Sequence, residues 1–64
     1  MMRVGLYERT APSQAWQFVE ETTPEMAALA VEVNKNFGVQ TMYIYPLTQG
    51  YPRFLDCDSE GRFE

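Results

Sequence analysis

The sequence contains no histidine, and Cys57 is its only cysteine. A single cysteine cannot close a disulfide within the chain, whereas small secreted domains usually depend on several. The same shortage excludes the tetrahedral zinc sites that cysteine and histidine build. A reactive thiolate needs a neighbouring base or a positive field, but Cys57 lies between two aspartates. We therefore interpret Cys57 as a small apolar side chain on a strand.

Long hydrophobic runs are also missing. Met1-Met2-Arg3 leads only into Val4-Gly5-Leu6 before charge returns at Glu8. So short a run builds neither a signal-peptide core nor a membrane span, and we expect a cytoplasmic protein without membrane contact. The 64 residues show no repeat, linker or low-complexity tract, so we expect one domain over 1–64 with a thin core. A domain of this size works most readily by presenting a surface.

Basic residues are scarce: five stand against nine acids, a formal charge of −4. No base occurs between Arg9 and Lys35, and the acids in that interval are Glu20, Glu21, Glu25 and Glu32. After Arg53 follow four more, Asp56, Asp58, Glu60 and Glu64. The negative electrostatic field of these acids repels phosphate backbones, which argues against direct binding of nucleic acid. The same field steers a protein toward basic surfaces of other proteins. The alternative interpretation is that the acidic residues only keep the protein soluble.

Two strands begin the predicted fold. Residues 3–9 and 15–20 alternate between two faces, and residues 10–13 between them carry the proline and serine of a turn. A short helix from Ser13 is the competing interpretation of the second segment, but its aromatic and β-branched residues favour a strand. The expected faces are Val4 and Leu6 against Gly5 and Tyr7, and Trp16 and Phe18 against Ala15, Gln17 and Val19.

A helix is predicted from Pro24 to about Asn36. Thr23 can cap it, proline suits the first helical position, and Gly38 supplies the left-handed residue that ends it. An apolar stripe at helical spacing is expected to cover one sheet face, and it comprises Met26, Leu29, Ala30, Val33 and Phe37.

The rest of the chain predicts more sheet. Residues 39–45 alternate, Pro46 ends that strand, and residues 47–50 make a turn. Residues 51–56 form a further strand that Pro52 confines to an edge or to its first positions, and a short strand at 62–64 remains open. The predicted class is α+β, with one helix packed on a small antiparallel sheet in the order β-β-α-β-β.

The acidic end contains the first half of a calcium loop. Asp56, Asp58, Glu60 and Gly61 match positions one, three, five and six, but the sequence stops before a twelfth position and no flanking helices are predicted. We favour a turn over residues 58–61 on a solvated acidic edge. The paired Asp56 and Asp58 lack the apolar pocket that acid–base catalysis requires, so we expect no enzyme, no metal and no cofactor.

Most aromatic residues must build the core, because the strands offer little else. Tyrosines that remain outside are good anchors for a protein interface, and the candidates are Tyr43, Tyr45 and Tyr51. Glu25 and Glu32 lie seven residues apart on one flank of the predicted helix. They form either a contact face or an ordinary solvated face, and Lys35, three residues beyond Glu32, can pair with it.

Three segments together resemble a known class of small proteins. They are the helix "TPEMAALAVEVNKNFG", the strand "VQTMYIYP" and the tail "FLDCDSEGRFE". In length, in acidity and in its one helix against a small antiparallel sheet, the chain resembles several anti-CRISPR proteins, which phages and mobile elements encode to disable host machinery. That class shares no sequence motif. The resemblance implies binding to a CRISPR effector, with acidic residues on a basic surface that binds DNA or recognises the PAM.

We therefore expect a monomeric binding protein that inhibits a host nucleic-acid-processing complex. Its contact candidates are Glu20, Glu21, Glu25, Glu32, Tyr43, Tyr45, Tyr51, Asp56, Asp58 and Glu60. An inhibitor of host transcription follows from the same acidic chemistry and remains an alternative. A second alternative is an accessory subunit or homo-oligomer that pairs its edge strands, against which Pro52 and the tail charges argue.

Overall fold

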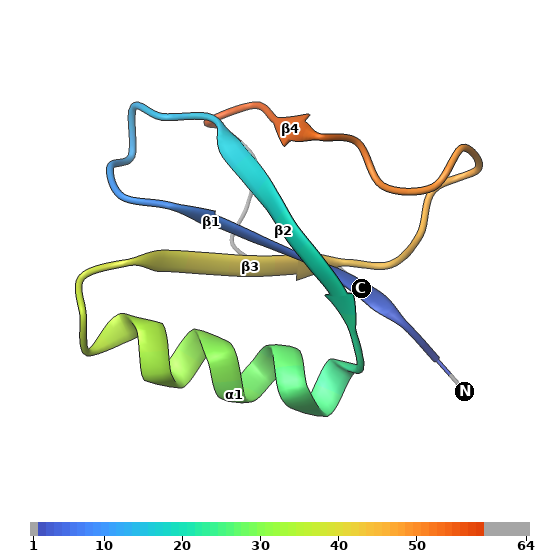
Figure 1. The fold of residues 1–64 in the computed structure, drawn as a ribbon. Coiled ribbons are helices and arrows are strands. Elements are labelled where there is room, and N and C mark those ends of the chain that lie inside the picture. The colour runs from blue at the N-terminus through green and yellow to red at the C-terminus, as the bar shows by residue number, and fades with distance from the viewer. Residues whose placement is uncertain (1, 59–64) are drawn as a thin grey trace.

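The computed structural model describes residues 2–58. Its elements follow the order β1 (Val4–Arg9), β2 (Trp16–Thr22), α1 (Pro24–Lys35), β3 (Gln40–Ile44) and β4 (Phe54–Leu55). The strands form one antiparallel sheet in the spatial order β3-β1-β2-β4. The helix α1 lies on one side of this sheet, and the segment between β3 and β4 packs on the other (Figure 1). The predicted α+β class, one helix on an antiparallel sheet, is confirmed.

The strand faces follow the alternation of the sequence. Val4 and Leu6 pack with Ala27 of α1 on the helix side. Tyr7, Trp16, Met42 and Ile44 form a second buried cluster on the opposite side. Residues on neighbouring positions of a strand point to opposite faces, so β1 contributes to both clusters. The sheet is therefore the middle layer of a thin three-layer molecule.

A β-bulge interrupts the pairing of β1 with β2. Leu6 pairs with Glu20 and Tyr7 pairs with Phe18, so Val19 has no partner on β1. A bulge places an extra residue on one strand and changes the direction of the side chains around it. Glu20 consequently lies across from Leu6 on the helix side of the sheet. Strict alternation from Trp16 and Phe18 would have placed it on the opposite face.

The boundaries of α1 agree with their local signals. Thr23 is the N-cap, and its Oγ1 accepts a hydrogen bond of 3.3 Å from the backbone N–H of Met26. Pro24 occupies the first helical position, where a missing N–H costs nothing. After Lys35 the chain turns through Gly38, whose φ of 74° is the left-handed conformation that terminates helices.

The predicted packing face of α1 is wrong at four of its five residues, and only Ala30 packs toward the sheet as expected. Met26, Leu29, Val33 and Phe37 are exposed, whereas the face turned to the sheet consists of Ala27, which is buried, and Ala30, Val31 and Asn34, which are partly buried. Residues 27, 30, 31 and 34 have the same helical spacing as the predicted stripe, so the sequence carries two overlapping stripes. The small alanines allow α1 to approach the sheet closely.

Asn34 explains why the second stripe faces inward. Its Nδ2 donates to Oε2 of Glu8 on β1 at 3.1 Å and to Oγ1 of Thr41 on β3 at 3.0 Å. These hydrogen bonds tie the last turns of α1 to the two strands it contacts. Turning the helix to bury Leu29 and Val33 would break both and leave partly buried polar groups without partners.

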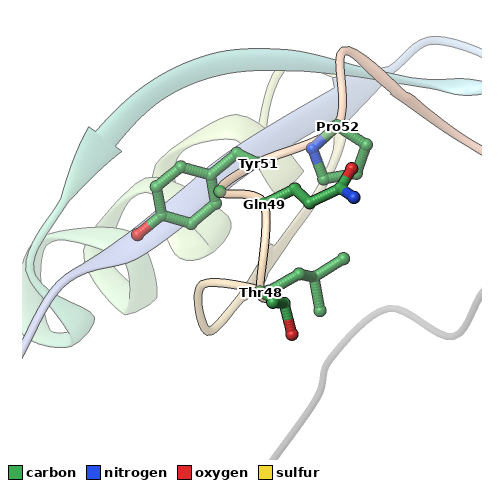
Figure 2. Close-up of a pocket in the computed structure, with 6 residues that line it drawn as sticks. Thr48, Gln49, Tyr51 and Pro52 are labelled. Atoms are coloured by element: carbon green, nitrogen blue, oxygen red, sulfur yellow. The ribbon is translucent and has the colours of Figure 1, made fainter.

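The segment after β3 covers the second sheet face. Residues 47–50 form the predicted turn, with hydrogen bonds in both directions between Leu47 and Gly50. Tyr51 then extends toward β1, while Thr48 lies on the far side of the turn (Figure 2). The Tyr51 ring packs on Gly5 and stacks on Phe18, with ring centroids 5.6 Å apart.

The predicted strand over 51–56 is shorter than expected. Only Phe54 and Leu55 pair with β2. Pro52 has no N–H to donate to a ladder, and its carbonyl accepts a hydrogen bond from the Tyr7 hydroxyl. These side-chain contacts hold residues 51 and 52 against the face of the sheet and away from its edge. Most of the turn predicted over 58–61 and the optional strand at 62–64 lie outside the described residues.

Candidate functional site

The surface most suited to binding is a groove between α1 and β2, which we call the α1–β2 groove. It has a volume of about 320 Å³ and is lined by Leu6, Glu8, Val19, Glu20, Thr22, Met26, Leu29, Ala30, Val33 and Asn34. Its apolar walls are open to solvent: Met26 is 57% exposed, Leu29 58%, Val33 48% and Val19 45%. Four neighbouring apolar side chains exposed to this extent mark a surface suited to an apolar partner.

Two features of the fold create the groove. The helix packs on β3 and β1, and it therefore leaves the helix side of β2 uncovered. The bulge places Val19 and Glu20 next to each other along this uncovered strip. The exposed stripe of α1 then forms one wall, and β2 forms the other.

Carboxylates surround these apolar walls. Glu8 and Glu20 belong to the lining itself. Glu25 lies four residues before Leu29 and Glu32 lies three after it, so both flank the outer side of the exposed helical stripe, and both are exposed. No lysine or arginine lines the groove within residues 2–58. The groove is therefore apolar inside and acidic at its margins.

The remaining acidic candidates lie elsewhere. Glu21 pairs with Gly5 in the sheet and faces the side away from α1, where its Oε1 lies 3.8 Å from Nη2 of Arg3. Asp56 and Asp58 are exposed and follow β4, which pairs with Trp16 and Gln17 at the start of β2, whereas the groove is lined by residues farther along that strand. Glu60 lies outside the described residues. Glu20 thus lines the α1–β2 groove and Glu25 and Glu32 flank its helical wall, whereas Glu21, Asp56 and Asp58 do not border it.

The three candidate tyrosines do not form one surface. Tyr43 and Tyr45 are partly buried against the cluster under α1, whereas Tyr51 is partly buried against the opposite cluster. All three contribute to packing, and only their outer edges reach solvent.

The sequence did not predict that Val19, Met26, Leu29 and Val33 form an exposed surface. The second helical stripe at residues 27, 30, 31 and 34 was the signal that could have revealed them.

A wider hollow of about 550 Å³ lies on the other flank of α1, lined by Arg9, Trp16, Val31, Lys35, Gly38, Val39, Gln40 and Thr41. Its arginine is already engaged within the fold. The Arg9 guanidinium lies 4.0 Å from the centre of the Trp16 ring, and its nitrogens donate to Gln40 Oε1 and to the carbonyls of Pro12, Gln14 and Cys57. Arg9 is therefore a structural residue that joins the β1–β2 loop and the segment after β4 to the sheet.

The hollow drawn in Figure 2 is a local feature of the chain. Its lining consists of the consecutive residues 47–52, none of which is charged. Within residues 2–58, no three histidine, cysteine, aspartate or glutamate side chains gather in a way that could hold a metal ion. The helix of this described part is too short and too polar to cross a membrane.

Two tyrosines have shifted acidities. Burial raises the pKa of Tyr7, and the neighbouring Tyr51 raises it further. Burial also raises the pKa of Tyr51, together with the carboxylate of Glu21, while Arg3 acts in the opposite direction. Both hydroxyls therefore stay neutral at physiological pH. They serve packing between the sheet and the segment after β3, and they are not poised for proton transfer.

No protein-family model, curated protein or solved structure matches this chain. The geometry of the groove and the distribution of charge are thus the observations from which a function can be inferred.

Proposed function

We propose that this chain is a non-catalytic binding protein that inhibits a nucleic-acid-processing complex by covering a basic surface of that complex. The observation that carries the proposal is the α1–β2 groove, where exposed apolar side chains are flanked by Glu8, Glu20, Glu25 and Glu32. Surfaces that bind nucleic acid are rich in lysine and arginine, and an acidic surface with an apolar centre complements them in charge and still gains from desolvation.

A CRISPR–Cas effector in the bacterial cytoplasm is the favoured target. The support for this choice is the resemblance to several anti-CRISPR proteins in length, in acidity and in the packing of one helix on a small antiparallel sheet. Host RNA polymerase presents a basic channel of the same kind and is the second target to examine. In either case the inhibitor acts by occupying the surface, and no residue of this chain is assigned a chemical step.

The first experiment is a pull-down of the tagged protein from a lysate that contains a CRISPR system, with bound proteins identified by mass spectrometry. We expect a Cas subunit or effector complex. Recovery of RNA polymerase instead would keep the inhibitory binding and change the target. A lysate series that yields no nucleic-acid-processing protein would contradict the proposal, leaving the acidity as a means of solubility.

Two charge-matched double variants then test which acidic surface makes contact. E25Q/E32Q removes two charges beside the groove, and D56N/D58N removes two charges after β4, so both change the net charge equally. We expect E25Q/E32Q to weaken target binding about tenfold and to reduce its dependence on salt. Because all four residues are exposed, neither variant should change the melting temperature by more than a few degrees. Equal affinities of both variants and the unmodified protein would contradict an acidic contact.

A further inference from the structure

We infer that the α1–β2 groove binds an amphipathic helix of the target protein, one with apolar residues along one face and lysine or arginine on both flanks. The assignment of this helix to the inhibited target rests on the proposed function. Three properties of the groove select this one kind of ligand, namely its shape, its apolar lining and its charge.

The shape of the groove suits a rod. It is open along one side, and its long wall is the exposed stripe of α1 from Met26 to Val33. At a rise of 1.5 Å per residue this wall is about 10 Å long, which corresponds to about two turns of a partner helix. Helices that bind in grooves insert side chains spaced at three and four residues, and two turns present about three of them.

The lining suits apolar side chains. Leu6 and Ala30 lie at the base, and Val19, Met26, Leu29 and Val33 stand on the two sides. Methionine on a wall adapts its shape to different apolar partners. The lining thus offers apolar contact along its length, with the polar groups of Thr22 and Asn34 at its margins.

The charge of the margins decides between possible occupants. A second copy of this chain would bring Glu20, Glu25 and Glu32 of one molecule near their counterparts, and two chains of charge −4 repel each other. An anionic lipid surface would be repelled for the same reason. A helix with basic flanks gains from the same carboxylates, because its lysines can reach the margins while its apolar face enters the groove.

The test uses the full chain and a synthetic peptide of about five helical turns, made of leucine and lysine so that the leucines fall on one face. A scrambled peptide of the same composition measures attraction by charge alone. A peptide in which glutamine replaces lysine measures apolar attraction alone. Fluorescence anisotropy gives the affinities, and amide chemical shifts map the site.

We expect the leucine–lysine peptide to bind at least tenfold more tightly than both comparison peptides, with shifts concentrated in α1 and β2. The variant L29Q/V33Q should weaken this binding about tenfold, as loss of central anchors does. Both residues are exposed and glutamine forms helices well, so the fold should persist. A28Q alters an exposed residue of α1 outside the groove lining and should leave binding unchanged.

Several results would overturn the inference. These are equal binding of the scrambled peptide, shifts centred on Asp56 and Asp58, absence of binding, or a dimer in light scattering that L29Q/V33Q dissociates. The proposed function fails separately. If a target recovered from lysate binds the unmodified protein and L29Q/V33Q equally, the groove is not its site, although inhibition stands. If the peptide binds as expected and no such target is recovered, the groove stands and the function does not.

Discussion

At the scale of single residues, Gly5 determines where a distant segment rests. A Cβ atom placed on Gly5 would lie 2.8 Å from Cε1 and 3.0 Å from Cγ of Tyr51, closer than packed carbon atoms approach. The ring of Tyr51 is also held by stacking on Phe18 at a centroid distance of 5.6 Å. The missing side chain of Gly5 therefore makes the space into which the segment after β3 packs.

Replacement of Gly5 by alanine tests this contact. Alanine is intrinsically better than glycine in a strand, so without the contact G5A would stabilise the protein by up to about 1 kcal/mol. We expect instead a loss of about 1–3 kcal/mol from overpacking, measured by urea unfolding. In the background of Y51A the cost should largely disappear, so the double variant should lose less stability than the two single losses combined. An equal cost in both backgrounds would show that Tyr51 is not the cause.

At the scale of elements, local residues specify the boundaries of α1 strongly. The sequence of α1 alone specifies only weakly which face turns toward the sheet. Thr23, Pro24 and Gly38 set its boundaries through interactions with the neighbouring backbone. Its rotation about its own axis is set by Asn34, which reaches Glu8 and Thr41 on two strands. The helix therefore starts and stops according to nearby residues, and it faces the sheet according to residues far along the chain.

The cap of α1 provides a prediction at this scale. Thr23→Ala removes the hydroxyl that accepts a hydrogen bond from the Met26 N–H, and we expect a loss of about 1 kcal/mol in the free energy of unfolding. Thr23→Asp restores an acceptor and adds a negative charge at the positive end of the helix, so it should match or exceed the original stability. Chemical denaturation of the three proteins measures both effects. Equal losses in T23A and T23D would argue against the capping role.

At the scale of the whole molecule, a sheet of four short strands is covered by two different layers. The layer formed by α1 leaves an exposed groove, whereas the segment after β3 is bound through specific contacts. These are the packing of Tyr51, the hydrogen bond from Tyr7 to Pro52, and the hydrogen bond from Arg9 to Cys57. A domain of this size has a small margin of stability, so both layers are needed.

The contacts of the second layer predict how stability depends on pH. The pKa values of Tyr7 and Tyr51 in the folded protein lie above the unfolded value of 10.0. The folded state thus holds these protons more tightly, and the stability they contribute is complete below about pH 10 and lost as the pH rises through the folded pKa values. We expect urea midpoints that are lower at about pH 11 than at about pH 8.

The variant Y7F/Y51F is the control for this effect. It removes both titrating hydroxyls and keeps the rings, so its urea midpoint should fall less between the two pH values than that of the unmodified protein. Tyr43 and Tyr45 remain in the variant and supply the same background in both proteins. An identical fall in the two proteins would show that the pH dependence arises elsewhere.

Local chemistry in the sequence determined much of this fold. The cap at Thr23, the left-handed residue at Gly38 and the turn at 47–50 each depend on a few adjacent residues, and the faces of β1 and β3 follow from simple alternation. The acidity of the surface could likewise be predicted from the sequence, because charged side chains stay exposed whichever way the core packs. These features could be predicted because no distant part of the chain competes for them.

Tertiary structure alone decided the candidate site. The helix carried two stripes at the same spacing, one of large apolar residues and one of small residues with Asn34. The stripe that includes Ala27 faces the sheet, where Asn34 donates hydrogen bonds to two strands. The bulge at Val19 arose from the pairing of β2 with β1, which strand alternation does not encode. Both choices depend on residues that are far apart in the sequence and that folding brings together. The α1–β2 groove exists because of these two choices.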